Sequence, residues 1–353
     1  MNQQPSISII IPIYGVEAWL ERAVSCLQAQ TFSNFELWLV DDGSPDSSGQ
    51  ICDRLAAEDD RIRVIHQANA GAAAARNAAI KKATGEYLYF MDGDDWCEPS
   101  MLEDLYGFAS RYCLDLVVTG FYIDTYYKQD KFYEELRTAP EVVYASQQQF
   151  REHAHELFDA QLLYAPWNKL YRREYLERKG ILFPATFWDD LPFNLDVIRD
   201  IERVGCLEGR YYHFLRARAE SENTKYRADM YDKREEEHAW LQELYAHWDL
   251  DSPDIQEFLA RRYSERLVGC VENVANPSCA MNNAQKLAEV KRIISTPQAR
   301  EALQKTKPSS KMMKLLLDPM SKGDAKGTLR YGKIISFVRR HNTNLFARLK
   351  ANR

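Results

Sequence analysis

The chain has 353 residues, 45% hydrophobic and 12% aromatic, which supports a large folded core and argues against disorder. Because this length exceeds one average domain, we expect a main domain and an appendage. The net charge is −6, but residues 305–353 carry 13 Lys and Arg against two acids, about +11, which leaves about −17 on the remainder. A basic segment on an acidic body points to an anionic partner surface.

The cysteines and the N-terminal residues favour a reducing compartment. The seven cysteines are scattered and include no Cys-x-x-Cys pair, so neither a disulfide framework nor a zinc site is expected. Met1 is followed by polar residues and a short strand, so no signal peptide is expected. No apolar stretch approaches the length needed to span a bilayer. We therefore expect a cytoplasmic protein.

Strands and helices alternate within residues 6–91. Short runs rich in β-branched residues indicate strands, and apolar residues at helical spacing indicate helices. Such alternation predicts an α/β fold, with a mostly parallel central sheet, right-handed crossovers and helices on both faces. The expected strands are 6–12, 35–40, 62–65 and 87–91, and the expected helices are 17–27, 47–58 and 71–80.

The pattern changes after residue 99. A further strand is expected at 114–121, a hairpin or surface excursion at 122–141 and a helix at 147–163. From about residue 230 the chain reads as almost wholly helical. We therefore expect a main domain over 1–225, a helical region over 226–305 and a basic tail over 306–353. The helices expected after residue 225 are 229–247, 253–274, 283–295 and 298–306.

Polar residues follow the ends of the predicted strands. Asp41 and Asp42 follow the second strand, and Asp92 and Asp94 follow the fourth. In parallel sheets such strand ends share one edge, where ligands bind. Carboxylates at 41 and 42 could accept hydrogen bonds from a base or a ribose, and Arg76, at the start of a helix, could neutralise phosphate.

The run Asp92-Gly-Asp94-Asp95 has two interpretations. Oxygen ligands at a strand end suit Mg²⁺ or Mn²⁺, which keep coordination positions for substrate phosphates. In isolation the same run is equally typical of a solvated turn, because Asp and Gly are favoured at turn positions. The chain has neither of the glycine-rich loops that bind dinucleotides or triphosphates. Acids and a metal without such a loop indicate a nucleoside diphosphate leaving group.

Seven short runs then occur in a recognisable order. They span about residues 6–222 and are Ile-Ile-Ile-Pro12-Ile-Tyr14, Val-Asp41-Asp42-Gly-Ser, Asn69-Ala-Gly71-Ala-Ala-Ala-Ala-Arg76-Asn77, Met-Asp92-Gly-Asp94-Asp95, Trp167-Asn-Lys-Leu-Tyr-Arg, Trp188-Asp189-Asp190-Leu-Pro-Phe-Asn and Tyr-Tyr-His213-Phe-Leu-Arg216-Ala-Arg218-Ala-Glu-Ser221. Any one run is a weak signal, but all seven in this order are a strong one. Together they resemble the family 2 glycosyltransferases, which have the A-type nucleotide-diphospho-sugar transferase fold, and the resemblance implies that residues 1–225 form a nucleotide-sugar-binding catalytic domain.

The resemblance implies a role for each matching residue. Asp190 would be the catalytic base, with Asp189 as the other candidate because the family more often has Glu-Asp here. Asp92 and Asp94 would hold the ribose, the metal and the diphosphate. Gly15 replaces the Asn that the family usually has after the tyrosine of the first run. The residues implied to line the uracil and ribose are Pro12, Tyr14, Glu17, Asp41 and Asn69, with Arg76 nearby.

Four further residues have a functional and a structural interpretation. Trp188 could stack on an acceptor sugar or pack in the core. His213 could be a metal or diphosphate ligand, or a packed, hydrogen-bonded histidine. Arg216 and Arg218 could clamp the diphosphate from a loop, or be ordinary surface arginines.

The resemblance implies metal-dependent, inverting transfer of a sugar from a UDP-sugar to a hydroxyl of a surface-glycan acceptor, of the capsule, exopolysaccharide or teichoic-acid type. A hydroxyl is a poor nucleophile at neutral pH, so a carboxylate must take its proton. Mn²⁺ or Mg²⁺ would offset charge on the leaving diphosphate. The alternatives are a nucleotidyltransferase that forms sugar nucleotides, which usually opens with a glycine-rich loop, and a non-catalytic glycan-assembly subunit.

The basic tail has more than one interpretation. Residues 333–340 and 345–350 mix large apolar residues with cations, as an interfacial helix would. Peripheral attachment to the anionic inner face of the cell membrane would bring the enzyme to lipid-linked acceptors. A solvated tail is the alternative, and nucleic-acid binding is not expected because nothing else in the sequence supports it. Residues 226–305 could build the acceptor side or a homodimer contact.

Overall fold

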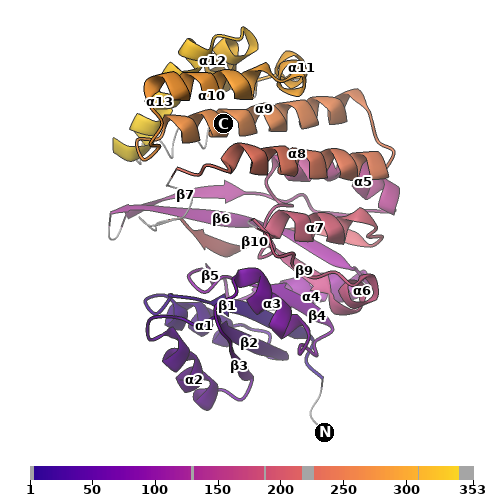
Figure 1. Ribbon diagram of the computed structural model, residues 1–353. Coiled ribbons are helices and arrows are strands. Elements are labelled where there is room, and N and C mark those ends of the chain that lie inside the picture. Colours follow the sequence, from indigo (N-terminus) through magenta and orange to yellow (C-terminus); the bar gives the residue numbers. More distant parts are fainter. Residues whose placement is uncertain (1–3, 129–130, 187, 217–225, 309, 342–353) are drawn as a thin grey trace. The chain divides into compact units, whose positions relative to one another are not determined.

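The computed structural model describes residues 4–128, 131–186, 188–216, 226–308 and 310–341 (Figure 1). The chain divides into two units, Met1–Asp124 with Glu134–Arg216, and Thr125–Tyr133 with Ala217–Arg353. The domain boundary predicted near residue 225 lies outside the described residues.

The first unit begins with a parallel sheet built on β1 (Ile7–Ile13), whose apolar residues are buried on both faces. β1 pairs in parallel with β2 (Phe35–Asp41) and β4 (Tyr87–Phe90), and β2 pairs in parallel with β3 (Ile62–His66). The predicted mostly parallel α/β sheet is confirmed. The connecting helices, indigo and violet in Figure 1, are α1 (Leu20–Gln28), α2 (Ser48–Glu58) and α3 (Ala72–Ile80).

Beyond β4 the sheet becomes mixed. β9 (Lys169–Arg172) lies antiparallel between β4 and β6 (Leu116–Lys128), and β10 (Val204–Leu215) runs parallel to β6. The main path of the sheet, over the described residues, is β3-β2-β1-β4-β9-β6-β10-β5. The other elements here are β5 (Trp96–Cys97), α4 (Met101–Arg111), β7 (Lys131–Arg137), β8 (Val142–Val143), α5 (Gln147–Asp159), α6 (Arg173–Lys179) and α7 (Asp190–Arg199).

Two predicted elements differ in extent from the observed ones. The helix predicted at 147–163 ends at Asp159, because Gln161 adopts a left-handed backbone with φ 64° that the helix cannot continue through. The strand predicted at 114–121 continues to Lys128 and pairs with β7. The hairpin predicted at 122–141 is therefore present, formed by β6 and β7 as an extension of the sheet.

An aromatic cluster supports the segment that leads into α7. The rings of Phe183 and Phe193 stack with centroids 3.8 Å apart, and Phe90 meets them edge-on at 5.1 and 5.7 Å. The guanidinium carbon of Arg76 lies 5.0 Å from the centre of the Phe183 ring. Full burial of an aromatic side chain contributes about 1.5–3 kcal/mol, so this cluster anchors the segment firmly.

The second unit is helical, and α8 (Met230–His247), α9 (Pro253–Ala275) and α10 (Asn283–Ser295) run side by side in Figure 1. α11 (Pro297–Lys305), α12 (Lys311–Ser321) and α13 (Ala325–His341) follow. The first four confirm the predicted helices. For α9, α10 and α11 the first residue can be predicted from the sequence, because each follows a Ser, Asn or Thr whose side chain accepts a backbone hydrogen bond.

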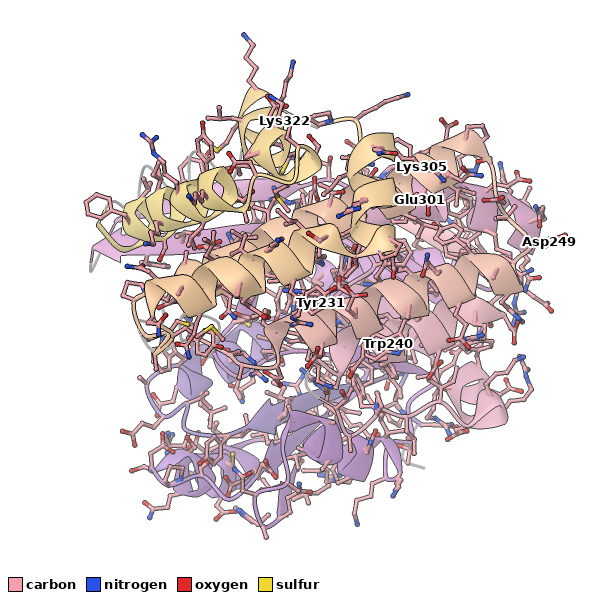
Figure 2. The ribbon with its side chains drawn as sticks, turned by 45° about the horizontal axis from the view of Figure 1, so that its top comes forward. Tyr231, Trp240, Asp249, Glu301, Lys305 and Lys322 are labelled. Atoms are coloured by element: carbon pink, nitrogen blue, oxygen red, sulfur yellow. The ribbon has the colours of Figure 1, made fainter. Side chains whose placement is uncertain are left out.

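α12 and α13 share the core of this unit. Met313 and Leu329 are buried in one cluster with Leu267 of α9. The outer surface carries charged pairs such as Glu301–Lys305 on α11, 2.8 Å apart and visible in Figure 2. Such exposed pairs contribute only about 0.3–0.5 kcal/mol each, so apolar packing dominates. None of the described helices has the length and apolar composition needed to cross a membrane.

Candidate active site

The ends of the first two strands lie on one edge of the sheet. Ile13, the last residue of β1, pairs with Asp41, the last residue of β2. The amide of Asp42 donates to the carbonyl of Ile13 at 2.9 Å, and the amide of Val16 donates to Ser48 Oγ at 3.0 Å. The loops that follow β1 and β2 are therefore joined.

Arg76 connects three acids on this edge. It lies on α3 with only 5% of its side chain exposed. Nη2 donates to Asp92 Oδ1 at 2.9 Å, while Nη1 donates to Asp190 Oδ1 at 3.0 Å and to Asp189 Oδ2 at 3.2 Å. Burial disfavours the charged guanidinium, but the three carboxylates outweigh it and hold the pKa of Arg76 above its usual value. The structure thus brings together one predicted metal ligand, both candidate bases and the predicted phosphate-binding arginine.

Asp190 is the more accessible of the two candidate bases. Its side chain is 36% exposed against 17% for Asp189, and its Oδ2 makes no hydrogen bond within the described residues. Burial raises the pKa of Asp190 to about 7; Arg76 opposes this rise, and Asp189 adds to it. Because a third of the side chain meets solvent, water screens part of the shift. A carboxyl group that titrates near neutral pH is suited to taking a proton.

Burial also raises the pKa of Asp189, and Arg76 opposes that rise too. The two neighbouring carboxyl groups therefore share one guanidinium and titrate together.

The first turn of α7 is held by the buried Asn194. Its Nδ2 donates to the carbonyl of Asp190 at 2.8 Å and to that of Tyr164 at 3.1 Å. Its Oδ1 accepts from the hydroxyl of Tyr171 at 2.8 Å. Trp188, just before the two acids, has φ 62°. A non-glycine residue rarely adopts this conformation, which clusters at functional sites.

Asp42 organises the loop that leads into α3. Its carboxylate is buried, and Oδ1 accepts from the amide of Ala70 at 2.9 Å and from Gln67 Nε2 at 2.7 Å. Oδ2 accepts from the amide of Gly71, the residue before α3, at 2.8 Å. Both oxygens of this predicted substrate ligand are thus engaged with the chain.

Asp41 faces a histidine that sequence reasoning did not single out. Its Oδ2 lies 2.9 Å from His66 Nδ1, and its Oδ1 accepts from the amide of Ser44 at 3.0 Å. Burial opposes ionisation, but these hydrogen bonds hold the pKa of Asp41 below its usual value. The hydrogen bonds that the His66 ring donates to Asp41 and Asp53 raise the pKa of His66. Asp41 is therefore ionised, with the imidazole beside it.

The remaining residues implied to contact uracil and ribose lie in the same loops. Tyr14 is 51% exposed, Asn69 is exposed and Pro12 is half-buried. Glu17 Oε2 accepts from the amide of Ser47 at 2.9 Å, which ties the loop after β1 to the start of α2. Tyr14 and Asn69 are accessible to a ligand.

The loop that carries Asp92 and Asp94 is anchored by Asp95. This buried carboxylate accepts from the amide of Leu215 at 2.7 Å and from the hydroxyl of Tyr212. The same hydroxyl accepts from the amide of Asp92 at 3.1 Å. Burial, together with the charges of Asp94 and Asp92, holds the pKa of Asp95 well above its usual value. β10 thus fixes the position of this loop.

Sequence reasoning missed the anchoring roles of Tyr212 and Asn194. Both lie within runs that carry the family resemblance. That resemblance was their only signal, because no spacing or charge pattern identifies a hydroxyl or an amide that joins two distant segments.

His213 lies in an acidic cluster. Its Nδ1 is 3.0 Å from Asp124 Oδ2, its Nε2 is 3.2 Å from Glu98 Oε1, and Trp96 stacks on its ring at 3.5 Å. Ligand atoms of His213, Asp124 and Glu134 lie within 4.8 Å of one another, close enough to hold a cation. The placement is compatible with either predicted interpretation, a metal ligand or a packed histidine.

Of the two arginines predicted to clamp the diphosphate, the structure describes only Arg216. Arg216 Nη1 donates to Glu135 Oε1 at 3.1 Å, and the Glu135 side chain is almost fully buried. Arg218 lies outside the described residues.

Comparisons with known proteins identify the family. Residues 8–180 match the family model described as Glycosyl transferase family 2. The Bacillus subtilis (strain 168) protein named Uncharacterized glycosyltransferase EpsJ is 34% identical over 314 residues, which is 86% of this chain and 87% of that protein. The chain belongs to glycosyltransferase family 2. The predicted family and enzyme class are confirmed, and this membership weighs against the nucleotidyltransferase alternative.

Solved structures show the same fold as this glycosyltransferase. S. aureus TarS 1–349 in complex with UDP has a TM-score of 0.62 at 19% identity, over 96% of this chain and 93% of that one. TarS 1–349 was also solved in complex with UDP-GlcNAc. The mannosyltransferase PcManGT from Pyrobaculum calidifontis, in complex with GDP-Man and Mn²⁺, has a TM-score of 0.51 at 15% identity, over 96% and 89%. At these identities the likeness establishes the fold alone.

Proposed function

We propose that this chain is a metal-dependent, inverting glycosyltransferase that moves a sugar from a UDP-sugar to an acceptor hydroxyl of a surface glycan. The observation that carries the proposal is the guanidinium of Arg76, which joins Asp92 to Asp190. Asp92 is the residue expected beside the leaving diphosphate, and Asp190 is the expected base. The group that leaves and the group that takes a proton would then meet at one edge of the sheet.

The nucleotides bound to structural neighbours support the donor class. TarS carries UDP or UDP-GlcNAc, and PcManGT carries GDP-Man. We favour a uridine donor because the fold likeness to TarS is the greater, with TM-scores of 0.62 against 0.51. The exposed Tyr14 and Asn69 would contact the nucleoside beside the ionised Asp41.

In the proposed reaction the acceptor hydroxyl attacks the anomeric carbon from the face opposite the diphosphate. The bond from that carbon to the diphosphate oxygen breaks, so the configuration inverts. The accessible Oδ2 of Asp190 would accept the hydroxyl proton. Arg76 would hold Asp190 in place and keep it close to Asp92, the acid expected beside the leaving diphosphate.

The donor set fits a hard divalent cation. When ionised, Asp92, Asp189 and Asp190 outnumber the single charge of Arg76, and Asp94 adds a further acid. Asp92 is 30% exposed, and its Oδ2 makes no hydrogen bond within the described part of the chain. Held by Asp92 and Asp94, Mg²⁺ or Mn²⁺ would offset the charge that develops on the leaving diphosphate.

Replacing Asp190 tests the proposed base. Asp190→Asn keeps the size of the side chain but removes the proton acceptor, so we expect transfer to fall about 10²- to 10⁴-fold. The measurement is UDP release from a panel of UDP-sugars with Mn²⁺ present, alongside thermal unfolding to confirm that the fold persists. The matched control is Asp196→Asn, an exposed acid on the same helix.

Two outcomes would contradict this proposal. Full activity in Asp190→Asn would show that Asp190 is not the base. Release of pyrophosphate when a nucleoside triphosphate and a sugar phosphate are supplied as substrates would instead indicate nucleotidyl transfer.

We also propose that α13 contacts an anionic membrane. Ile334 and Phe337 are 47% and 61% exposed. Lys326, Arg330 and Lys333 line the same open groove, of about 670 Å³, as these two apolar residues. Large apolar side chains beside cations suit an interfacial helix. Such contact would bring the enzyme to a lipid-linked acceptor at the inner face of the cell membrane.

A further inference from the structure

Two cysteines from different elements touch beside the Asp-Gly-Asp loop. Cys26 lies on α1, and Cys97 lies on β5, shortly after Asp94. Their sulfur atoms are 3.4 Å apart, and the amide of Cys97 donates to Cys26 Sγ at 3.3 Å. Cys26 is partly exposed, whereas Cys97 is almost fully buried. The fold alone brings these two thiols together, because they are 71 positions apart in the sequence.

The surroundings distinguish the two thiols. The hydrogen bond with the Cys97 thiol lowers the pKa of Cys26; burial opposes this, and the Cys97 amide and the charge of Arg22 lower the pKa further. The hydrogen bond to Cys26, together with burial, holds the pKa of Cys97 well above its usual value. Cys26 is therefore the more nucleophilic and the more accessible of the pair, since the thiolate is the reactive form.

We propose that Cys26 and Cys97 form an oxidant-sensitive dithiol that closes to a reversible disulfide. The Cys26 sulfur attacks hydrogen peroxide and breaks its O–O bond, giving a sulfenic acid and, with the thiol proton, one water. The Cys97 sulfur then attacks the Cys26 sulfur, the S–O bond breaks, and the departing hydroxide takes the Cys97 proton as a second water. Two thiols are oxidised and one peroxide is reduced.

The required movement is small. The sulfur atoms are already in contact at 3.4 Å, so a disulfide with a bond length of about 2.05 Å needs them to approach by about 1.3 Å. No other oxidant or partner cysteine is required. The remaining cysteines are either buried elsewhere or, for Cys113, exposed at the end of α4.

A bond here would act on the loop that carries Asp94. Arg22, one turn before Cys26 on α1, donates to the carbonyl of Asp94 at 2.8 Å. Gln30, just after α1, donates to the carbonyl of Glu98 at 2.8 Å. α1 and its end therefore already hold this loop on both sides of Cys97. Drawing the sulfurs together shifts the loop, and we expect donor turnover to fall; this consequence, unlike the disulfide itself, rests on the proposed function.

The test treats the full chain with hydrogen peroxide under native conditions and maps cross-linked peptides by mass spectrometry. We expect a Cys26–Cys97 cross-link that dithiothreitol removes. Cys26→Ser and Cys97→Ser should each abolish it, with Cys97→Ala as the second variant if serine disturbs folding. Cys113→Ser, which removes an exposed cysteine, should retain it. Survival of both thiols, or cross-linking to a different cysteine, would overturn the proposal.

UDP-sugar hydrolysis is measured on the same samples. Oxidation should lower the activity of the unmodified chain, dithiothreitol should restore it, and Cys26→Ser should be insensitive. A cross-link that leaves activity unchanged would refute the coupling to the Asp94 loop. A chain that is inactive in both redox states would contradict the proposed function, while the peptide map would still decide the dithiol proposal.

Discussion

At the residue scale, Arg76 sets the electrostatics of the candidate site. One guanidinium, 5% exposed, contacts Asp92, Asp189 and Asp190. A buried arginine stays charged at all working pH values, so it supplies a fixed positive charge that the three acids share. Removing any one acid leaves more of that charge for the other two. Asp189 and Asp190 therefore titrate as a coupled pair.

Asp190 gives this group a measurable pH dependence. The carboxyl must be ionised to take a proton, and burial raises its pKa to about 7. kcat/KM should therefore fall about tenfold per pH unit below that value. Asp189→Asn removes a like charge that raises the pKa of Asp190. It also leaves Asp190 as the one carboxylate of this pair that interacts with the positive charge of Arg76. We expect the acid limb of the profile to move to lower pH in this variant.

The measurement is the pH profile of kcat/KM for UDP release. Asp60→Asn is the control, because Asp60 is an exposed acid in the loop before β3, apart from the Arg76 cluster. Its profile should match that of the unmodified chain. An acid limb that stays in place or moves to higher pH in Asp189→Asn contradicts the coupling between the two acids.

The candidate residues could be found from sequence, but their contacts could not. Asp92, Asp94 and the 189–190 pair lie in runs that resemble one family, and this resemblance identified them. That a single arginine on α3 joins two of these runs depends on how β4 and α7 are placed around it. Those placements follow from packing against distant residues such as Phe183, which no local pattern reveals.

At the scale of elements, the start of α3 depends on one side chain. Asp42 accepts hydrogen bonds from the amides of Ala70 and Gly71 and from Gln67. Asp42→Ala removes the acceptor of these partly buried hydrogen bonds, and a hydrogen bond of this kind contributes about 0.5–1.5 kcal/mol. We expect a corresponding loss of stability in urea unfolding, and weaker activity because α3 carries Arg76.

The control is Asp53→Ala, because Asp53 is 65% exposed and, among the described residues, its carboxylate pairs with the side chain of His66 alone. Its stability should stay within about 0.5 kcal/mol of the unmodified chain. If Asp42→Ala is as stable as this control but binds donor poorly, Asp42 acts on substrate rather than on the loop.

β9 shows why some elements escaped prediction. The parallel strands can be predicted from their apolar, β-branched runs. β9, in contrast, is four residues long and begins with Lys169. That lysine is completely buried, and its ammonium donates to the carbonyls of Leu162 and Ala165. Burial lowers its pKa to about 7. A lysine is the least expected residue in a buried strand, so only the fold could place this one.

At the scale of the whole molecule, charge is divided unequally along the chain. The basic C-terminal segment includes α13, where Lys326, Arg330 and Lys333 line a groove with Ile334 and Phe337. Replacing both exposed apolar residues, Ile334→Glu with Phe337→Glu, should abolish sedimentation with phosphatidylglycerol vesicles. The unmodified chain should bind these vesicles, less tightly as salt rises because ions screen the attraction.

Tyr112→Glu is the matched control, since Tyr112 is a similarly exposed aromatic residue, at 45%, beside α4 of the first unit. It should bind vesicles normally. Vesicle binding that survives the double replacement would refute the membrane proposal. A change from dimer to monomer in gel filtration, with no effect on vesicles, would assign this surface to the homodimer contact instead.

The sequence by itself determined the alternating α/β unit, the helices from residue 230 onward, the family and the candidate acids, because periodicity, capping residues and short runs are local. Tertiary structure alone decided that Arg76 joins Asp92 to Asp190, that Tyr212 and Asn194 anchor the loops and that Cys26 meets Cys97. The contacts Cys26–Cys97, Arg76–Asp190, Tyr212–Asp92 and Asn194–Tyr171 each join segments more than 20 positions apart in the sequence. Side-chain contacts at such separation are set by how strands and helices pack, which no window of sequence contains.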